Sequence, residues 1–338
     1  MTTPPPNRTV WVDGTWALVL AGGEGSRLHS LTTTASGIVV PKQFCSLGYG
    51  PSLLTQSLIR AGSVAPIIQT CAVVAARHQW WWDQPLRSLP KENVFVQPEN
   101  RGTAHGVLLA LLRLEARDPR ANVLMLPADH YIRHEFLFSR SLREVAELSA
   151  RTEDAIFLLG ADPERADPEL GYILPAIQNC RKPTGVLSFV ERPDSSRLAE
   201  LLKAGALWNM FIIAGSVQAM LALYERSHQS SVALMRAALG GNKSRGPHPP
   251  SLAEVYQRLA TVDFSRGLLE PQAPRLQVLS VPSCGWNDLG TPKRVIETLR
   301  TLPAEPKRVD APPLSSAILS LADQYGRLTR EKSSSLPL

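Results

Sequence analysis

A glycine-rich segment with two nearby cationic side chains is the first feature of this sequence that could do chemistry. Residues 20–28 (LAGGEGSRL) contain Arg27, and Lys42 follows in the sequence PKQF. Glycines let backbone N–H groups crowd around phosphate oxygens. Arg27 adds a planar fork of donors and Lys42 a point charge. Together they predict a site for the phosphates of a nucleoside triphosphate.

Two familiar phosphate-binding loops do not fit the spacing of this segment. A P-loop would end in Gly-Lys-Ser/Thr, and a dinucleotide-binding loop that began at Gly23 would need glycine where Leu28 stands. That second loop would also need an acidic residue about 20 positions later, which the sequence lacks. A simple strand-to-helix turn explains the glycines equally well, so the segment alone leaves both interpretations open.

Two aspartates are candidate ligands of Mg²⁺. Asp129 comes just after the apolar run 122–126, where it would face a ligand crevice, and Asp288 lies in a turn flanked by Gly and Trp. Mg²⁺ commonly takes one or two carboxylates and completes its shell with phosphates and water, so this pair would suffice. For either residue alone, a helix cap or a turn remains the alternative.

Short apolar runs alternate with helix-like segments along the chain. Strands are expected at 16–21, 70–75, 93–96, 122–126, 155–159 and 186–190, and helices at 53–61, 102–115, 136–150, 195–204, 216–226 and 252–259. This alternation predicts βαβ units, a mostly parallel central sheet covered by helices, and ligands beyond the carboxyl ends of the strands.

Composition and length describe an ordinary globular protein. The 338 residues are 44% hydrophobic and carry a formal net charge of +6 with no block of five or six basic residues, which favours phosphorylated small molecules over nucleic acid. We expect a disordered segment at 1–11, a catalytic body at 12–300, and a Pro- and Ser-rich tail at 301–338 with a possible helix at 315–325.

Cysteine usage and hydropathy bear on the cellular compartment. The cysteines stand far apart without a CxxC pair, and we expect reduced thiols at Cys45, Cys71, Cys180 and Cys284. Residues 1–9 lack an apolar signal core, and no 18 uncharged apolar residues run together. We therefore expect a cytoplasmic protein that does not enter a membrane.

The combination of LAGGEGSRL and PKQF resembles the signature of the sugar-phosphate nucleotidyltransferases, and in detail that of the mannose-1-phosphate guanylyltransferases. Further segments resemble that family in the same order. They are QPENRGTA from residue 97, LPADH from 126, LGADP from 159, ELGYI from 169, FVERP from 189, LWN from 207 and GWNDLG from 285. The resemblance implies a three-layer, Rossmann-like α/β domain of the nucleotide-diphosphosugar transferase type.

The same resemblance implies a reaction and a role for each motif. The expected reaction joins GTP to mannose 1-phosphate with Mg²⁺ as cofactor, and gives GDP-mannose and pyrophosphate, in a possible homodimer. Arg27, Lys42 and Asp129 would be catalytic, with Asp129 and Asp288 on the metal. Nucleotide contacts are expected at Leu20, Ala21, Gly22, Gly23, Gly25, Gln97, Arg101, Gly102 and Thr103, and sugar-phosphate contacts at Gly171, Glu191, Arg192 and Asn209.

Three departures from the family pattern fall in the sugar pocket. Arg192 stands where the family usually has Lys, Met210-Phe211 replaces Ser-Gly after Trp-Asn, and ELGY replaces the usual Thr-Gly-Tyr-Gly. The alternatives are therefore a uridylyl- or thymidylyltransferase on another hexose 1-phosphate, or an inactive protein that binds nucleotide-sugars. The run Trp80-Trp-Trp82 cannot stack on one ligand, because a helix turns about 100° per residue, and it predicts packing or a subunit contact.

Overall fold

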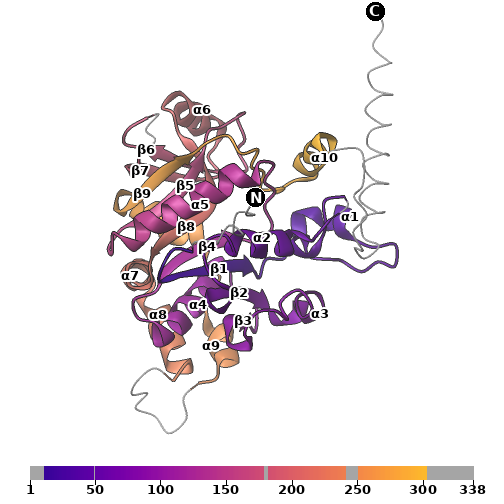
Figure 1. Ribbon diagram of the computed structural model, residues 1–338, viewed down its shortest axis with the longest axis vertical. Helices are drawn as coiled ribbons and strands as arrows, with labels where there is room; N and C mark the ends of the chain where they lie inside the picture. The colour runs from indigo at the N-terminus through magenta and orange to yellow at the C-terminus, as the bar shows by residue number, and fades with distance from the viewer. Residues whose placement is uncertain (1–10, 49, 179–181, 241–249, 303–338) are drawn as a thin grey trace, which may run out of the picture.

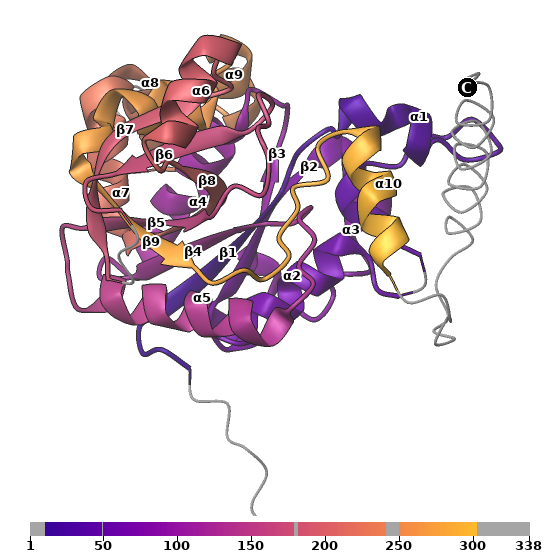
Figure 2. The same cartoon turned by 90° about the horizontal axis from the view of Figure 1, so that it is seen from above.

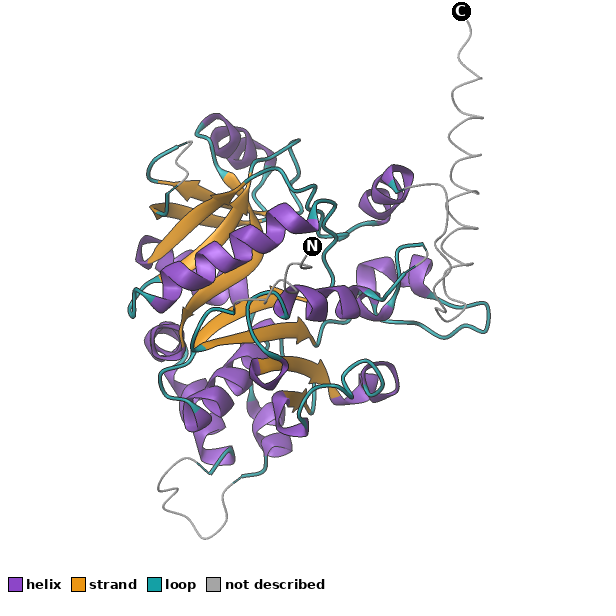
Figure 3. Cartoon of the chain, viewed as in Figure 1, coloured by secondary structure: helices purple, strands orange, loops and turns teal. Residues whose placement is uncertain are grey.

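A computed structural model describes residues 11–48, 50–178, 182–240 and 250–302 (Figure 1). These residues form one nine-stranded sheet between helices (Figure 3). The strands are β1 (Thr15–Ala21), β2 (Thr70–Ala75), β3 (Val94–Gln97), β4 (Asn122–Pro127), β5 (Ile156–Ala161), β6 (Gly171–Pro175), β7 (Thr184–Glu191), β8 (Leu207–Ser216) and β9 (Leu276–Val281).

The sheet has a parallel half and a mixed half, in the order β3-β2-β1-β4-β8-β5-β9-β7-β6. Strands β3, β2, β1 and β4 are parallel, as the alternation of strands and helices predicts. Strand β8 then enters antiparallel between β4 and β5. Because β6 pairs with both β7 and β8, the last five strands close on themselves. The three-layer α/β class is confirmed, whereas a mostly parallel sheet describes only the first half.

Helices cover both faces of the sheet (Figure 2). Two large hydrophobic cores result. The first contains apolar residues of α2 (Leu53–Ala61), α5 (Glu135–Ala150) and α6 (Ser195–Lys203). The opposite core contains α4 (Thr103–Arg117), α7 (Val217–Ser227), α8 (Gln229–Ala238) and α9 (Leu252–Arg258). Two single-turn helices, α1 (His29–Thr32) and α3 (Gln79–Trp82), lie towards the side where α10 (Pro292–Thr301) stands.

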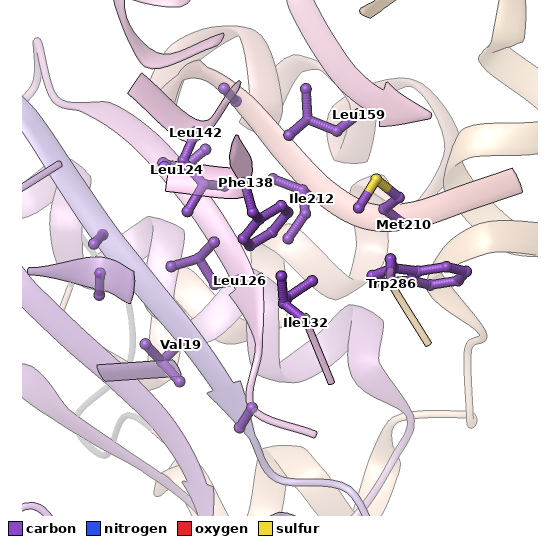
Figure 4. Packing of buried hydrophobic residues seen from close by; sticks show 14 of the residues in the cluster. Val19, Leu124, Leu126, Ile132, Phe138, Leu142, Leu159, Met210, Ile212 and Trp286 are labelled. Carbon is purple, nitrogen blue, oxygen red and sulfur yellow. The ribbon is translucent and has the colours of Figure 1, made fainter. Parts of the chain in front are cut away.

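Strand periodicity explains how the two cores are separated. Alternate residues of β4 belong to opposite cores, with Leu124 and Leu126 on the α5 side and Val123 and Met125 on the α4 side. Figure 4 shows the first core, in which Phe138 of α5 lies among side chains of β4 and β8. Trp286, from the loop after β9, packs into the same core near Met210, so this core also holds the loop that follows β9.

The expected strands and helices all occur, with ends shifted by a few residues. The apolar-run argument missed β6, β8 and β9. Of the three adjacent tryptophans, Trp82 is buried and donates its indole N–H to the carbonyl of Ala75, whereas Trp80 is 86% exposed. The expected segment at residues 1–11 and the tail from 301, with its helix at 315–325, lie almost wholly outside the described residues.

Candidate active site

A cleft of about 470 Å³ lies beside the ends of β1, β3 and β4, a volume that suits a small-molecule ligand. Fifteen of the predicted site residues line it: Leu20, Gly22, Gly23, Gly25, Arg27, Lys42, Gln97, Gly102, Thr103, Asp129, Gly171, Glu191, Arg192, Asn209 and Asp288. Segments from residue 20 to residue 288 thus meet in one place. The motifs were identified separately along the chain, and the fold brings them to a single cleft.

Lys42 lies between the two predicted metal ligands. Its buried ammonium stands 2.8 Å from Asp129 Oδ2 and donates a hydrogen bond to the main-chain oxygen of Asp288 at 2.6 Å. Burial alone would raise the pKa of Asp129, but the charge and the hydrogen bond of Lys42 outweigh it and hold that pKa below its ordinary value. The Asp129 carboxylate is therefore ionised and already paired with a cation.

His130 supports Asp129 as a neutral ring. Its Nδ1 accepts the indole N–H of Trp286 at 3.1 Å, so the ring proton belongs on Nε2, which lies 3.7 Å from Asp129 Oδ1. Burial lowers the pKa of His130 to about 4, despite the opposing pull of Asp129. At neutral pH the imidazole therefore lies beside Asp129 without a charge.

The second aspartate is held by a different cation. The guanidinium of Arg294, in α10, donates to Asp288 Oδ1, and it also donates to Asp167 Oδ1 at 3.3 Å. Asp167 lies in the connection between β5 and β6, shortly before Glu169 and Leu170, which line the cleft. A buried arginine thus ties the Asp288 loop to the segment that leads into β6.

The glycine-rich loop packs closely against two partners. Gly25 has φ +63°, and a Cβ at this position would lie 3.0 Å from that of Lys42, so only glycine fits without strain. A Cβ on Gly22 would collide with the amide of Gln97. The loop is also braced by Gln43, whose amide donates to the carbonyls of Ala21 and Gly23 at 2.9 Å each. The backbone of the loop is held open towards the cleft.

At the β3 end of the cleft, an amide oxygen has no partner. Gln97 is only 5% exposed, and its Oε1 accepts no hydrogen bond from any described residue. A buried acceptor left without a donor is costly, and this oxygen lies against Gly106. Gly102 and Thr103 line the cleft beside it, where α4 begins.

Two of the expected nucleotide contacts do not line the cleft. The side chain of Arg101 turns back to Glu99, at 2.8 Å, while its carbonyl accepts a bond from the amide of Val262. Ala21 is buried in the core, because successive residues of β1 alternate between the two faces of the sheet. We therefore leave both out of the candidate site.

The other end of the cleft gathers the expected sugar-phosphate contacts. A Cβ on Gly171 would lie 2.6 Å from Glu191 Oε2 and 3.4 Å from the Cβ of Asn209, so these three residues are immediate neighbours. Burial and the nearby Asp263 raise the pKa of Glu191, against the opposing charge of Arg192. This is a polar and acidic pocket with an arginine at its rim.

One ion pair connects the two ends of the cleft. Arg27 Nη1 lies 3.0 Å from Glu169 Oε2, and both side chains are about half exposed, at 47% and 48%. An exposed pair of this kind is worth at most about 1 kcal/mol. A phosphate oxygen could therefore take the place of Glu169 on Arg27 at little cost.

Two turns of the same form face this cleft. In residues 208–211, the Met210 turn, Asn209 Oδ1 accepts the N–H of Phe211 at 3.0 Å. In residues 286–289, the Asp288 turn, Asn287 Oδ1 accepts the N–H of Leu289 at 2.8 Å.

Both turns end in a residue with positive φ. Within the described ranges, three non-glycine residues have positive φ, namely Arg192, Phe211 and Leu289, and all three line the cleft. Backbone strain of this kind costs about 1–3 kcal/mol per residue and tends to gather at functional sites. The strained non-glycine residues of the described ranges are thus all located at the cleft, which supports its role as a functional site.

The donor set suits Mg²⁺ better than a softer metal. Two carboxylates line the cleft, and the ammonium of Lys42 shows that positive charge is stable between Asp129 and the Asp288 loop. In the part of the chain that the structure describes, no three His, Cys, Asp or Glu side chains gather as a metal cage. Mg²⁺ needs no such cage, because it draws its other ligands from phosphates and water.

Sequence reasoning missed several residues that shape this site. They are Gln43, Asp167, Glu169, Phe211, Trp286 and Arg294. Gln43 and Trp286 lie inside motifs that were identified, so their position was a usable signal. Arg294 carried no signal, since an arginine in an amphipathic helix ordinarily faces water.

Comparisons with known proteins agree on the family. The family model described as "Nucleotidyl transferase" matches residues 16–305. The alginate biosynthesis protein AlgA of Pseudomonas aeruginosa is 31% identical over 210 residues, 59% of this chain and 41% of its own. The mannose-1-phosphate guanylyltransferase RfbM of Salmonella typhimurium is 30% identical over 211 residues, 59% of this chain and 42% of its own.

A solved structure extends the likeness to most of the fold. A Thermus thermophilus protein described as a mannose-1-phosphate geranyltransferase superposes with a TM-score of 0.72 at 27% identity, covering 86% of this chain and 80% of that one. The present chain matches only about two fifths of the length of the two curated relatives. None of the helices in the described ranges is long and apolar enough to cross a membrane.

Proposed function

Since the chain belongs to the nucleotidyl transferase family, we propose that it transfers GMP from GTP to mannose 1-phosphate and so makes GDP-mannose and pyrophosphate. The observation that carries the proposal is the meeting of Asp129, Asp288 and Lys42 in one cleft, within hydrogen-bond reach of one another through the lysine. Two carboxylates that can hold a divalent cation, with a lysine beside them, are what an enzyme needs to bring two phosphates together.

Charge neutralisation and positioning would carry out the reaction. An oxygen of the sugar phosphate attacks the α-phosphorus in line, a P–O bond forms, and pyrophosphate leaves with the electron pair of the broken bond. The attacking phosphate has a second pKa near 6, so it is largely dianionic at neutral pH and needs no general base. The proposal therefore gives no general-base role to His130, whose pKa is lowered by burial and whose Nδ1 accepts the indole N–H of Trp286.

The cations of the cleft would be redistributed when substrate enters. Arg27 would exchange Glu169 for a phosphate oxygen, and Lys42 would move from Asp129 to the triphosphate. Mg²⁺ held by Asp129 and Asp288 would neutralise the triphosphate and align the reacting groups. Glu191, Arg192 and Asn209 would hold the sugar phosphate at the other end of the cleft.

Guanine is favoured by the β3 end of the cleft. Gln97 lines this end of the cleft, and its amide could pair with the Watson–Crick edge of guanine, which offers an imino and an amino group. Leu20, Gly22, Gly23 and Gly25 would contact the nucleotide, with Gly102 and Thr103 near the base. The names of the curated relatives support the same nucleotide and sugar.

We assign the catalytic body to residues 12–300 and place the reaction in the cytoplasm, where both substrates would be available. A pyrophosphate-release assay with Mg²⁺ tests the proposal, using GTP, UTP, dTTP, CTP and ATP against mannose, glucose and N-acetylglucosamine 1-phosphates. We expect turnover with GTP and mannose 1-phosphate. Turnover only with another pair would replace the substrates but keep the mechanism.

The matched control is Asp129→Asn, which keeps the shape of the side chain and removes its charge. This variant should keep its unfolding temperature within a few degrees and lose turnover. Wild-type activity in the variant would remove Asp129 from the metal site. Nucleotide binding by the wild type with no pyrophosphate release from any pair would instead identify a protein that only binds.

A further inference from the structure

Arg294 is a buried cation that the proposed reaction does not use. It lies in the first turns of α10, where Pro292 occupies the beginning of the helix and Thr291 accepts the N–H of Arg294 as N-cap. Its side chain is 3% exposed, although arginine is almost never fully buried unless it is paired. A charge in this position must have partners that stabilise it.

The partners of Arg294 are two carboxylates from different parts of the chain. Nη1 donates to Asp288 Oδ1, while Nε lies 3.3 Å from Asp167 Oδ2 and Nη2 donates to Asp167 Oδ1. The guanidinium therefore binds Asp167 through Nε and Nη2 and binds Asp288 through Nη1. The charge of Arg294 is divided between Asp288 and Asp167, and Asp167 Oδ2 also lies 3.5 Å from Arg165 Nε. Asp288 is therefore only partly neutralised and can attract a further cation.

Asp167 is in turn fixed to the sugar-phosphate end of the cleft. The Tyr172 hydroxyl donates to the carbonyl of Asp167 at 2.9 Å and accepts its N–H at 3.1 Å. The same hydroxyl accepts the indole N–H of Trp208 at 3.0 Å. A continuous chain of bonds thus runs from the Met210 turn through Tyr172, Asp167 and Arg294 to the Asp288 carboxylate.

We propose that Arg294 is a positioning residue, which holds the Asp288 carboxylate in one orientation at the cation site and couples it to the Asp167 segment beside the sugar-phosphate pocket. The inference rests on the proposed function, in which Asp288 binds the divalent cation. Arg294 itself would touch neither the cation nor the substrates. Its effect would pass through the carboxylate that it holds.

Loss of Arg294 should change metal affinity and turnover in opposite directions. Without the guanidinium, Asp288 loses its counter-charge, while Asp167 keeps Arg165 at 3.5 Å, and a divalent cation is attracted to Asp288 more strongly. The same loss frees the Asp288 carboxylate to turn, so the bound cation no longer aligns the reacting phosphates. A purely structural arginine would lower the unfolding temperature and would not produce this opposition.

The test uses the full chain and Mn²⁺ as the probe, with free Mn²⁺ measured by electron paramagnetic resonance in the presence of GTP and without sugar phosphate. For Arg294→Met we expect Mn²⁺ to bind about threefold more tightly or better. We expect kcat to fall about 10- to 100-fold. Arg294→Lys keeps the charge and loses the fork, so its Mn²⁺ affinity should match the wild type while kcat still falls.

Arg300→Met is the matched control, because Arg300 is an exposed arginine of the same helix. Both measurements should stay within about twofold of the wild type in this variant. Unchanged kcat in Arg294→Lys, or parallel losses of kcat and Mn²⁺ affinity in a folded Arg294→Met, would overturn the inference. Should Arg294→Met unfold, Arg294→Lys decides alone.

Failure of the inference and failure of the proposed function are distinguishable. The Mn²⁺ titration requires no turnover, so it reports on Arg294 even if the natural substrates differ from GTP and mannose 1-phosphate. A wild-type enzyme that releases no pyrophosphate would contradict the proposed function alone.

Discussion

The Met210 turn and the Asp288 turn have nearly the same backbone and present different side chains to the cleft. Each begins Trp-Asn, each uses the asparagine Oδ1 to hold the N–H two residues later, and each ends in a left-handed residue, with φ of 56° and 51°. The rings of Trp208 and Trp286 lie 6.1 Å apart. The two turns are neighbours as well as copies of one local structure.

The third residue of each turn shows how context sets the outcome. Met210 is fully buried, because it belongs to β8, where alternate side chains enter the core. Asp288 lies in a loop after β9 and faces the cleft. The exposure of the fourth residues is reversed, since Leu289 is fully buried whereas Phe211 is partly exposed. One turn therefore presents an acid to the ligand and the other an aromatic ring.

The largest expected difference between the turns concerns catalysis. Asp288→Asn should lower kcat by roughly 10²–10³-fold, because it removes charge where charge on the triphosphate must be balanced. Met210→Leu, at the equivalent position, should leave kcat within about threefold, since it exchanges one buried apolar side chain for another. Steady-state pyrophosphate release measures both. Equal losses in the two variants would show that the turns do not differ in function.

Acid should loosen the Asp288 turn before the Met210 turn. The unfolded chain protonates His130 at its ordinary pKa of 6.5, whereas the folded protein resists protonation until about 4. The unfolded state therefore binds more protons in that window, and His130 lowers the free energy of unfolding by up to about 3 kcal/mol as pH falls through it. In the Met210 turn, the indole of Trp208 donates to the Tyr172 hydroxyl, so no histidine accepts the corresponding hydrogen bond.

Urea unfolding without metal, at about pH 7.5 and about pH 4.5, tests this difference. His130→Gln should lose less stability between the two pH values than the wild type does. An identical pH dependence in both proteins would contradict the assignment of His130 as a buried neutral ring.

Glycine substitution should separate the two left-handed residues. Leu289→Gly relieves strain of about 1–2 kcal/mol but empties a fully buried site, so a net loss of about 2 kcal/mol is expected. Phe211→Gly relieves similar strain and gives up a ring that is only partly buried, so stability should change by about 1 kcal/mol or less. Urea unfolding measures both values. A larger loss for Phe211→Gly would mean that its contact with Phe264 dominates.

The smallest expected effect concerns the first asparagine. Asn209 Oδ1 already accepts the N–H of Phe211, so we expect its amide nitrogen to donate to a sugar hydroxyl. Asn209→Ala should raise the KM for sugar phosphate about fivefold, the value of one hydrogen bond, and change the KM for nucleotide little. Asn287→Ala should act on kcat instead, as it loosens the turn that carries Asp288. The reverse pattern would contradict the proposed division of the cleft.

The sequence predicted what local patterns specify. Apolar runs located β1 and β4, and the residues that follow them, Gly22 and Asp129, line the cleft as expected. The resemblance to a family added Glu191 and Asn209, which no periodicity singles out. Their roles in catalysis and binding remain proposals, whereas their common place in the cleft is observed.

Tertiary contacts specify the rest, and these leave no local trace. The insertion of β8 between β4 and β5 depends on pairing between residues 47 to 94 positions apart, so a strand-by-strand argument gave a sheet more parallel than the real one. Arg101 was expected to contact the base, but its side chain pairs with Glu99 and does not line the cleft. Arg294 reads as a surface helix residue until the fold brings Asp167 and Asp288 against it.

The unbroken sheet has a consequence for the kind of molecule that can react. Its strands run without interruption from β3, beside Gln97, to β7, which ends at Glu191, so no hinge separates the two ends of the cleft. If base and sugar bind at those ends, their spacing is built into the strand order. The protein would then select substrates by length, because only a nucleotide and a sugar that span this fixed distance can occupy both ends of the cleft at once.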